Sequence, residues 1–538
     1  MGRAYPRLTH SLVESILQKR FDGRFHSLSD LPDPYSFKDM RRAVDRIVTA
    51  IRKREKIVVV GDYDVDGITA TSVMRLFFRA MDYDIDWIVP NRFRDGYGLS
   101  PTLFSRISHA DLVVTVDNGI SAVDAAKMCA DADIDLIITD HHIVPPKIPD
   151  AYAIIDQKQR DCDFPYEEVC GAQIAWYLCA ALNRELGKRI DMKSMLDIVS
   201  LAVIADIMPL KHINRAMVTT GLKLLEKSQR AFVRAYREFS GKDRFTAEDI
   251  AFGLAPLLNS AGRMEDASIA CDFICSGNIY EARSILSQLV RMNEERKKIE
   301  RDIVSQALER VDMEKRVHIV TGEGWNEGVL GIVAARVARH CEAPTVVLTR
   351  KGDIYKGSGR SFGNCDLFGL IDGSRDILEK FGGHSAAVGL SLRADKMEMF
   401  KESVENDAVR MCDSDGYEDP AILGILDFEY IDFSLCELID RYEPFGHENP
   451  RPLFICENVE IVSVTQMGDS GDHLRLVVRQ GRYHLTALRF RVEDRERDIY
   501  RAGEKVDILF KISINEFRGE KSVRLLLEKV IPLPYGRG

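Results

Sequence analysis

Short apolar runs that end in acidic residues recur along the first half of this 538-residue chain. Segments of helical period separate the runs, which is typical of a parallel sheet covered by helices on both faces. The carboxyl ends of parallel strands meet at one edge of such a sheet, where open α/β sheets bind their ligands. We therefore expect the acidic residues to converge at that edge. The runs and the motifs that follow them are residues 57–60 with Asp62-Tyr-Asp-Val-Asp-Gly67, residues 112–116 with Asp117-Asn-Gly119, and residues 136–139 with Asp140-His-His142.

Carboxylates gathered at one sheet edge repel one another unless cations lie between them. For a single aspartate after a strand, the alternative is a capping or solvated carboxylate, but the whole set favours a pair of Mn²⁺ or Mg²⁺ ions. Two such ions are typical of phosphoester hydrolysis, in which one activates water and both stabilise the developing charge. Asp117 is our candidate for the carboxylate that bridges the ions. A calcium-binding loop starting at Asp62 is excluded, because its twelfth position is Val73 instead of glutamate.

Four acidic motifs follow one another in a fixed order. They resemble, in that order, the four motifs of the DHH phosphoesterase family, which is named after the third of them. The motifs are Asp62-Tyr-Asp-Val-Asp-Gly67, Asp117-Asn-Gly119, Asp140-His-His142 and Ala205-Asp-Ile-Met-Pro-Leu210.

Later segments are similar to the RecJ branch of this family and its DHHA1 domain. The segment from Pro444 to Phe454 is similar to the start of the oligonucleotide-binding (OB) domain of that branch, although Gly446-His-Glu448 stands where Gly-x-Gly is usual. The resemblance runs from about Asp39 to the end of the chain. The segments similar to the DHHA1-containing branch are Asn259-Ser-Ala-Gly-Arg263, Gly324-Trp-Asn-Glu-Gly-Val-Leu-Gly331, Lys356-Gly-Ser-Gly-Arg-Ser361 and Phe381-Gly-Gly-His-Ser-Ala-Ala-Val-Gly389.

The expected fold class is α/β: two α/β domains (DHH and DHHA1) joined by a long helix, plus a C-terminal OB-fold β-barrel. Changes in pattern and charge along the chain, together with the resemblance, predict the boundaries. These are an N-terminal helical extension at 1–55, the DHH domain at 56–275, the connecting helix at 279–316, the DHHA1 domain at 317–411 and the OB domain at 424–538.

The resemblance implies a role for each residue of the acidic motifs. Asp64 and Asp66 would contact the two ions, Asp117 would bridge them, and His141 and Asp206 would complete one coordination sphere. Asp62 would either ligate a metal directly or orient a neighbour, and the second role is also expected for Asp140 beside His141. His142 would face the scissile phosphate as a hydrogen-bond donor, and the alternative for it is a structural histidine bonded to the backbone.

A nuclease that starts at a 5′ end needs a pocket for that end, and a 5′-phosphate is best held by arginine forks and hydroxyls. Ser358 and Arg360 have strand alternation, so both can face a cleft. His384 resembles the DHHA1 residue beside the phosphates, and the glycines before it would permit close backbone approach. An isolated arginine is most often a surface charge, so these assignments depend on the motifs. The substrate-binding residues implied by the resemblance are Arg92, Arg263, Ser358, Arg360, Ser361, Gly382 and Gly383.

The chain carries 74 Lys and Arg against 84 Asp and Glu, a net charge of −10. This argues against attachment to nucleic acid by bulk charge but permits a local basic groove. The C-terminal domain offers such a groove, with a solvated barrel face and core aromatic residues as the alternative. The candidates for the groove are Arg475, Arg479, Arg489 and Arg491, with Tyr483 and Phe490 between them.

The resemblance implies a 5′ to 3′ exonuclease that hydrolyses single-stranded DNA to 5′-mononucleotides with two Mn²⁺ or Mg²⁺ ions, in DNA repair and recombination. The expected partners are single-stranded DNA with a 5′ end, single-strand-binding protein and a RecQ-type helicase. The sequence contains neither a long apolar segment nor a signal peptide, so we expect a cytoplasmic protein without a membrane partner.

Two other functions remain open at this point. Related DHH proteins hydrolyse short oligoribonucleotides, cyclic dinucleotides or pyrophosphate, but the C-terminal barrel expected here favours long single strands. A non-catalytic nucleic-acid-binding subunit, like the RecJ relatives attached to replicative helicases, would lack metal ligands. This alternative is disfavoured because the candidate ligands Asp64, Asp66, Asp117, His141 and Asp206 are all present.

Overall fold

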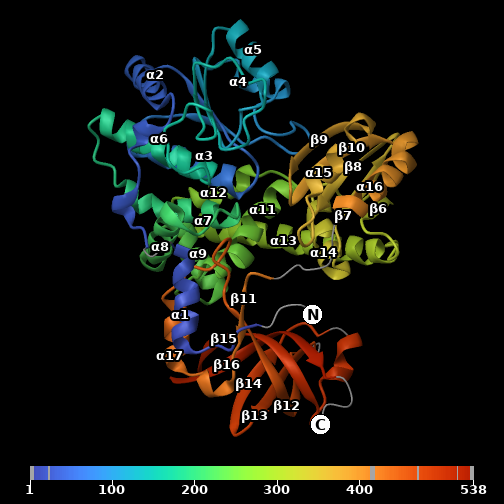
Figure 1. Ribbon diagram of the computed structural model, residues 1–538. Coiled ribbons are helices and arrows are strands. Elements are labelled where there is room, and N and C mark those ends of the chain that lie inside the picture. The colour runs from blue at the N-terminus through green and yellow to red at the C-terminus, as the bar shows by residue number, and fades with distance from the viewer. Residues whose placement is uncertain are drawn as a thin grey trace. The chain divides into compact units, whose positions relative to one another are not determined.

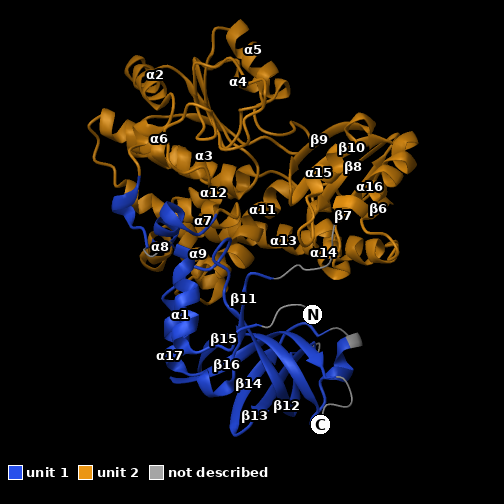
Figure 2. Ribbon diagram, in the orientation of Figure 1, with its two compact units in different colours: residues 1–31, 209–219, 418–538 blue, residues 32–208, 220–417 orange. Residues whose placement is uncertain are grey.

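The computed structural model describes residues 5–21, 25–411, 419–468, 472–492, 494–517 and 519–533. The chain forms two compact units (Figure 2). Unit 1 contains residues 1–31, 209–219 and 418–538, and unit 2 contains residues 32–208 and 220–417. Among the described residues, no helix is both long and apolar enough to cross a bilayer.

A five-stranded parallel sheet, in the order β2-β1-β3-β4-β5, forms the centre of the first α/β domain in unit 2 (Figure 1). All residues of β1, β3 and β5 are buried, as expected for strands covered by helices on both faces. The strands are β1 (Ile57–Val60), β2 (Asp86–Ile88), β3 (Leu112–Val116), β4 (Asp135–Thr139) and β5 (Ala153–Ile155).

Helices of the first domain cover this sheet and lead away from it. They end in α13, a 30-residue helix that packs against both α11 and α14. The helices are α2 (Met40–Lys53), α3 (Val65–Ala80), α4 (Phe104–Ile107), α5 (Val123–Asp131), α6 (Gly171–Glu185), α7 (Leu196–Ala205), α9 (Ala231–Ser240), α10 (Ala247–Asp249), α11 (Ala255–Met264), α12 (Ser268–Ile274) and α13 (Ile279–Leu308). Helix α8 (His212–Lys227) begins in unit 1 and ends in unit 2.

The second α/β domain of unit 2 has a mixed sheet in the order β6-β7-β8-β10-β9. In this sheet β6 pairs with β7 in parallel, whereas β7 with β8, β8 with β10 and β10 with β9 pair antiparallel. The elements are β6 (His318–Glu323), α14 (Leu330–Cys341), β7 (Thr345–Lys351), β8 (Ile354–Arg360), α15 (Leu367–Asp372), β9 (Leu378–His384), β10 (Ala387–Arg393) and α16 (Met397–Met411).

Unit 1 contains a C-terminal β-barrel. Its strands follow the order β11-β12-β13-β14-β16-β15, and an additional pairing of β12 with β15 closes the barrel. The elements are α1 (His10–Gln18), β11 (Ile422–Ile425), α17 (Phe433–Asp440), β12 (Leu453–Met467), β13 (His473–Gln480), β14 (Tyr483–Arg489), β15 (Lys505–Phe517) and β16 (Glu520–Pro532).

The expected fold class is confirmed, and the grouping of the N-terminal residues differs from a single extension at 1–55. Val13 and Leu17 of α1 belong to the same hydrophobic core as the barrel strands, so residues 1–31 group with unit 1. Helix α2 instead packs against α6 and β5 of unit 2. The apolar face of α1 thus packs into the barrel core of unit 1, and α2 packs against unit 2. The acidic segment between the second α/β domain and the barrel includes residues 412–418, which lie outside the described part of the chain.

Gly67, in the first turn of α3, permits the close approach of this helix to the end of β1. A β carbon at this position would lie 2.6 Å from Cα of Asp62. We predict that Gly67→Ala destabilises the first α/β domain, because overpacking costs about 1–3 kcal/mol and exceeds the gain of about 0.5–1 kcal/mol from a better helix former. A thermal melt should show a fall of several degrees. A β carbon on Gly277 would have no atom within 4 Å, so Gly277→Ala is the matched control and should melt like the wild type.

Candidate metal centre and phosphate pocket

Asp64 and Asp66 are held by the first turns of two helices. Oδ1 of Asp64 accepts the N–H groups of Asp66 and Gly67, at 3.0 and 3.2 Å, and so caps α3. The carboxylate of Asp66 accepts the N–H groups of Gly171 and Ala172, at 2.6 and 2.8 Å, at the start of α6. Helix N-termini stabilise negative charge, so both carboxylates are oriented before any ion binds.

Asp117 lies directly after β3 and has a left-handed backbone conformation, with φ of 63°. The side chain of the next residue, Asn118, holds this turn by donating to the carbonyls of Val60 and Val116 and by accepting the N–H of Leu99. A β carbon on Gly171 would overlap the Asp117 side chain, at 2.4 Å from its Cβ. The bend that aims Asp117 at the site therefore depends on contacts from three other segments.

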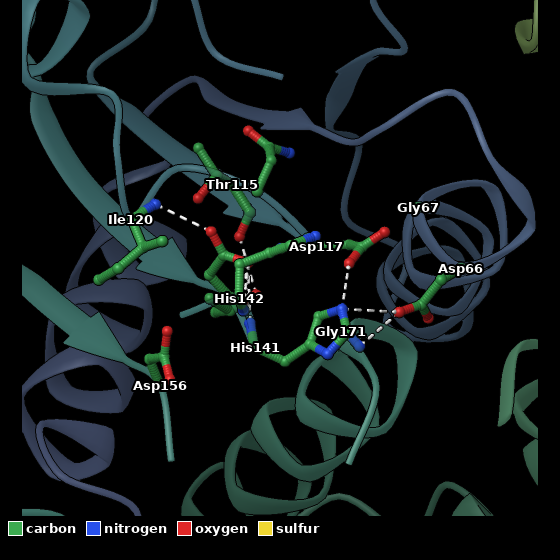
Figure 3. Close-up of polar contacts among 12 residues, drawn as sticks. Asp66, Gly67, Thr115, Asp117, Ile120, His141, His142, Asp156 and Gly171 are labelled. Carbon is green, nitrogen blue, oxygen red and sulfur yellow. Dashed lines mark hydrogen bonds and ion pairs between the residues drawn. The ribbon is translucent and has the colours of Figure 1, made fainter. Parts of the chain in front are cut away.

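His141 lies among three carboxylates, of which Figure 3 shows those of Asp66 and Asp117. Its Nε2 is 3.1 Å from Oδ1 of Asp117, 3.6 Å from Oδ2 of Asp66 and 3.6 Å from Oδ2 of Asp206. Asp206 comes directly after α7. Burial, more than any other cause, lowers the pKa of His141 to about 3, so the imidazole is neutral and has a lone pair for a metal.

Three groups of ligand atoms converge around Asp117 and His141. In each group the atoms all lie within 4.8 Å of one another, and the groups are Asp66, His141 and Asp206, then Asp62, Asp64 and Asp117, and then Asp117, His141 and His142. All six candidate metal ligands thus lie at one edge of the sheet. The groups that contain His141 offer oxygen and imidazole donors, which suit Mn²⁺, whereas Asp62, Asp64 and Asp117 offer oxygen alone, which also suits Mg²⁺.

The electrostatics of these carboxylates fit a cation site. Burial raises the pKa values of Asp62, Asp117 and Asp206 well above their usual range, and neighbouring carboxylates raise them further. Burial and Asp64 raise the pKa of Asp66 to about 6. Within the described part of the chain, no hydrogen-bond donor reaches the buried oxygens Oδ1 of Asp62, Oδ1 of Asp117 and Oδ2 of Asp206. Divalent ions would supply both the missing partners and the missing positive charge.

Both carboxylate oxygens of Asp140 accept hydrogen bonds from neighbouring residues. Its Oδ1 accepts the N–H groups of His141 and His142 and Nδ1–H of His142, the last at 2.6 Å, while Oδ2 accepts the N–H of Ile120 at 2.8 Å. Burial alone would lower the pKa of His142, but the hydrogen bond and charge of Asp140 raise it to about 9. The Tyr97 hydroxyl lies 3.2 Å from Nε2 of His142. This arrangement supports an orienting role for Asp140.

Asp156 is a further buried acid, and the sequence motifs did not include it. It follows β5, is fully buried, and lies at the same sheet edge as His142 (Figure 3). Burial raises its pKa to about 7. The signal that could have found it is its position after an apolar run, the same signal that identified Asp62 and Asp117.

Arg263 and Arg360 belong to different domains, and both lie against the segment that leads into α14. Nη1 of Arg263 donates to the carbonyl of Gly328 at 3.0 Å. The guanidinium of Arg360 donates to Oγ of Ser358 at 2.8 Å, and a β carbon on Gly331 would lie 2.8 Å from its Nη2. The absence of side chains at Gly328 and Gly331 thus lets both arginines approach this segment.

Of the other expected substrate-binding residues, Arg92 lies beside the metal-site motif, and Gly382 and Gly383 lie on β9. The Arg92 guanidinium is 4.2 Å from the centre of the Tyr63 ring, beside the metal-site motif. Gly382 pairs with Gly389, and a β carbon on either would meet open space, so the sheet backbone is accessible there. Gly383 has a positive φ of 145° and closely approaches Ala387.

His384 ends β9 and Ser361 directly follows β8, the two strands that pair with β10 on either side. Partial burial lowers the pKa of the exposed His384, and the positive charge of Arg360 acts in the same direction. His384 therefore lies within electrostatic reach of the candidate pocket. The Ser361 hydroxyl donates to the carbonyl of Cys365, so it holds the loop after β8 in this structure.

The barrel candidates divide into two groups. Arg479 pairs with Glu460 at 2.5 Å, and Arg489 with Glu496 at 3.0 Å, so part of the expected groove is engaged within the barrel itself. Tyr483 is partly buried against the barrel core. The exposed candidates are Arg475, Phe490 and Arg491.

We predict that Asp117→Asn abolishes metal-dependent hydrolysis and leaves binding of single-stranded DNA largely intact. Removing several kcal/mol of charge stabilisation should slow the reaction by about a thousandfold or more. In a chelating buffer, the variant should melt at a higher temperature than the wild type because one buried repelling charge is gone. The stabilisation of the wild type by Mn²⁺, about 2.7 kcal/mol at 100 times the Kd, should largely disappear.

Asp243→Asn is the control for these measurements, because Asp243 is exposed and lies outside the site. It should match the wild type in melting temperature, Mn²⁺ response and hydrolysis. Hydrolysis retained in Asp117→Asn, or an unchanged Mn²⁺ response, would contradict the assignment.

Comparisons with known proteins agree with the fold and the domain order. Three family models match the chain: the N-terminal domain of the DHH family at residues 56–203, the DHHA1 domain at 313–409 and the RecJ OB domain at 424–529. The chain is also similar in fold to a crystal structure of RecJ from Thermus thermophilus in complex with Mn²⁺. That match has a TM-score of 0.82 and 24% identity, and it covers 99% of this chain and 80% of the other.

Curated relatives match over most of the sequence. The single-stranded-DNA-specific exonuclease RecJ of Bacillus subtilis is 34% identical, over 96% of this chain and 67% of its own length. The protein of the same name from Escherichia coli is 32% identical, over 92% of this chain and 90% of its own length. The order of the three domains and the identity along the chain lead to one conclusion: this chain belongs to the RecJ family.

Proposed function

We propose that this protein is a 5′ to 3′ exonuclease that hydrolyses single-stranded DNA to 5′-mononucleotides by a two-metal-ion mechanism. The observation that carries the proposal is the convergence of ligand groups around Asp117 and His141, in the same unit as Arg263 and Arg360, which both lie against the start of α14. The first feature suits phosphodiester hydrolysis, and the second suits a terminal phosphate. The names of the curated relatives support single-stranded DNA as the substrate.

The metal chemistry is assigned to residues as follows. Asp66, His141 and Asp206 would hold one ion, Asp62 and Asp64 the other, and Asp117 would bridge both. Two Mn²⁺ or Mg²⁺ ions, when bound, activate water and stabilise the charge that develops on the phosphate. His142 would donate a hydrogen bond to the scissile phosphate, and Asp140 would hold the ring in position through Nδ1.

The direction of cleavage is assigned to the pocket. Arg263, Ser358 and Arg360 would bind the 5′-phosphate, with Arg92 on the metal-site side. The open backbone at Gly382 would permit a nucleotide to approach, and His384 would contact its phosphate. Arginine forks match the geometry of a phosphate monoester, so a chain end would be preferred to an internal phosphate. Ser361 would support this site through the loop that it holds.

The wider role follows from the family. The barrel would bind single strands downstream of the active site, through exposed residues such as Arg475 and Phe490. Action in DNA repair and recombination, together with single-strand-binding protein and a RecQ-type helicase in the cytoplasm, is part of the proposal.

Digestion of end-labelled DNA tests the polarity. A long 5′-phosphorylated single strand, labelled at either end, is incubated with Mn²⁺ beside its duplex and a five-nucleotide RNA. Release of 5′-mononucleotides from the 5′ end of the single strand is the expected result. Degradation of the short RNA alone would refute the proposal in favour of a small-substrate enzyme.

We predict that Arg360→Ala lowers the preference for a 5′-phosphorylated over a 5′-hydroxyl end by about 10- to 100-fold, because a hydrogen bond to a charged group contributes about 1.5–3 kcal/mol. The measurement is kcat/KM for two strands that differ only at that end. Arg393→Ala is the control, since Arg393 is 54% exposed and pairs with Asp395 at the far end of the hairpin. An unchanged preference in Arg360→Ala would remove this residue from the pocket.

A further inference from the structure

A buried charged cluster lies on α13, the helix between the two α/β domains. Arg296 donates from Nε and Nη2 to Oδ1 of Asn293, at 3.1 and 3.0 Å, and from Nη1 to Oε2 of Glu300, at 2.6 Å. The other oxygen of Glu300 forms an ion pair with Arg336 of α14. Only 1% of the Glu300 side chain is exposed. One carboxylate thus links the connecting helix to the second domain.

A contribution to the stability of the fold does not by itself explain a buried charged cluster. Burying charged groups is costly, and apolar side chains of similar volume often stabilise a protein equally well or better. What the cluster does provide is a defined geometry, because Arg296 is fixed by three hydrogen bonds and Glu300 is shared between two helices.

The position of α13 connects this geometry to the pocket. The helix packs against α11, which carries Arg263, and against α14. The segment leading into α14 accepts a hydrogen bond from Arg263 at Gly328, and Gly331 in its first turn lies against Arg360. Holding α14 on α13 therefore holds the contacts of both pocket arginines.

The charges around the candidate pocket also suit an anion. Burial lowers the pKa of Arg263 to about 10, the positive charges of Arg92, Arg296 and Arg360 act in the same direction, and the carboxylate of Asp64 opposes them. The one carboxylate of Glu300 already serves both Arg296 and Arg336. A phosphate monoester, with its high charge and several acceptor oxygens, is the ligand that such a group of guanidiniums suits best.

We propose that Glu300 is a positioning residue for end recognition: through Arg296 and Arg336 it fixes α14 against α13, and so sets the spacing of Arg263 and Arg360 that fits a 5′-terminal phosphate. This inference rests on the proposed function, because it presupposes that the pocket binds that phosphate.

The test is Glu300→Gln, which keeps the shape of the side chain and removes its charge. Steady-state kinetics are measured with Mn²⁺ on two single strands that differ only in a 5′-phosphate or a 5′-hydroxyl. The KM for the phosphorylated strand should rise by about 10- to 100-fold, the loss typical of a small displacement of binding groups. The KM for the hydroxyl strand and the kcat for both should change little, because the metal ligands are untouched.

Glu294→Gln is the matched control, since Glu294 lies on the same helix, is 62% exposed and forms a surface ion pair with Lys297. It should keep the wild-type preference. If Glu300→Gln fails to fold, Arg336→Gln is measured instead, because Arg336 is 47% exposed and the Arg296–Glu300 pair stays intact. A smaller loss of preference is expected there, with recovery in Arg336→Lys.

The outcomes separate the two proposals. A wild-type protein that degrades single strands without preferring a 5′-phosphate would refute the pocket, and this inference with it. A wild type that shows the preference, with Glu300→Gln or Arg336→Gln retaining it in full, would overturn the positioning role alone. If either variant melts at a lower temperature but keeps the wild-type preference for a 5′-phosphate, the positioning role is also overturned, because the cluster then serves stability alone.

Discussion

Mutual repulsion among buried carboxylates is the constraint on which the catalytic half of this structure depends. Asp62, Asp64, Asp66 and Asp117 come together at one sheet edge although burial and proximity oppose their charges. The N–H groups at the start of α6 offset part of this repulsion, and the turn held by Asn118 keeps Asp117 in place. These contacts leave several buried carboxylate oxygens without a hydrogen-bond partner among the residues that the structure describes. Carboxylate oxygens in this state are suitable ligands for divalent cations.

A second accumulation of like charge lies between the two α/β domains. Here the groups are guanidiniums, whose positive charges act on one another. In the proposed function the two charge groups complement different parts of one substrate, with the cations at the phosphodiester that is cut and the arginines at a phosphate at the chain end. Helix α13 is central to this arrangement because it packs on an element of each domain.

Much of this could be predicted from local pattern. The apolar runs at 57–60 and 112–116 are strands with those bounds, because a strand buried on both faces has a nearly unbroken apolar sequence. The division of the N-terminal residues between two units could not be predicted in this way, since α1 and α2 are both amphipathic and nothing local indicates which core each one meets. Asp156 was missed although it follows a strand, and the Asn293–Arg296–Glu300 cluster reads in sequence as part of an ordinary charged helix face.

By itself, the sequence determined the fold class and predicted the sheet edge and the candidate metal ligands, because strand ends and motif order are local properties of the chain. Only the tertiary structure decided how the ligands divide around Asp117 and His141, since that division depends on distances between segments far apart in sequence. It also decided which arginines lie close to one another. Arg296 and Arg336 have the same chemistry as any surface arginine until packing buries Glu300 between them, and burial is a property of the folded chain alone.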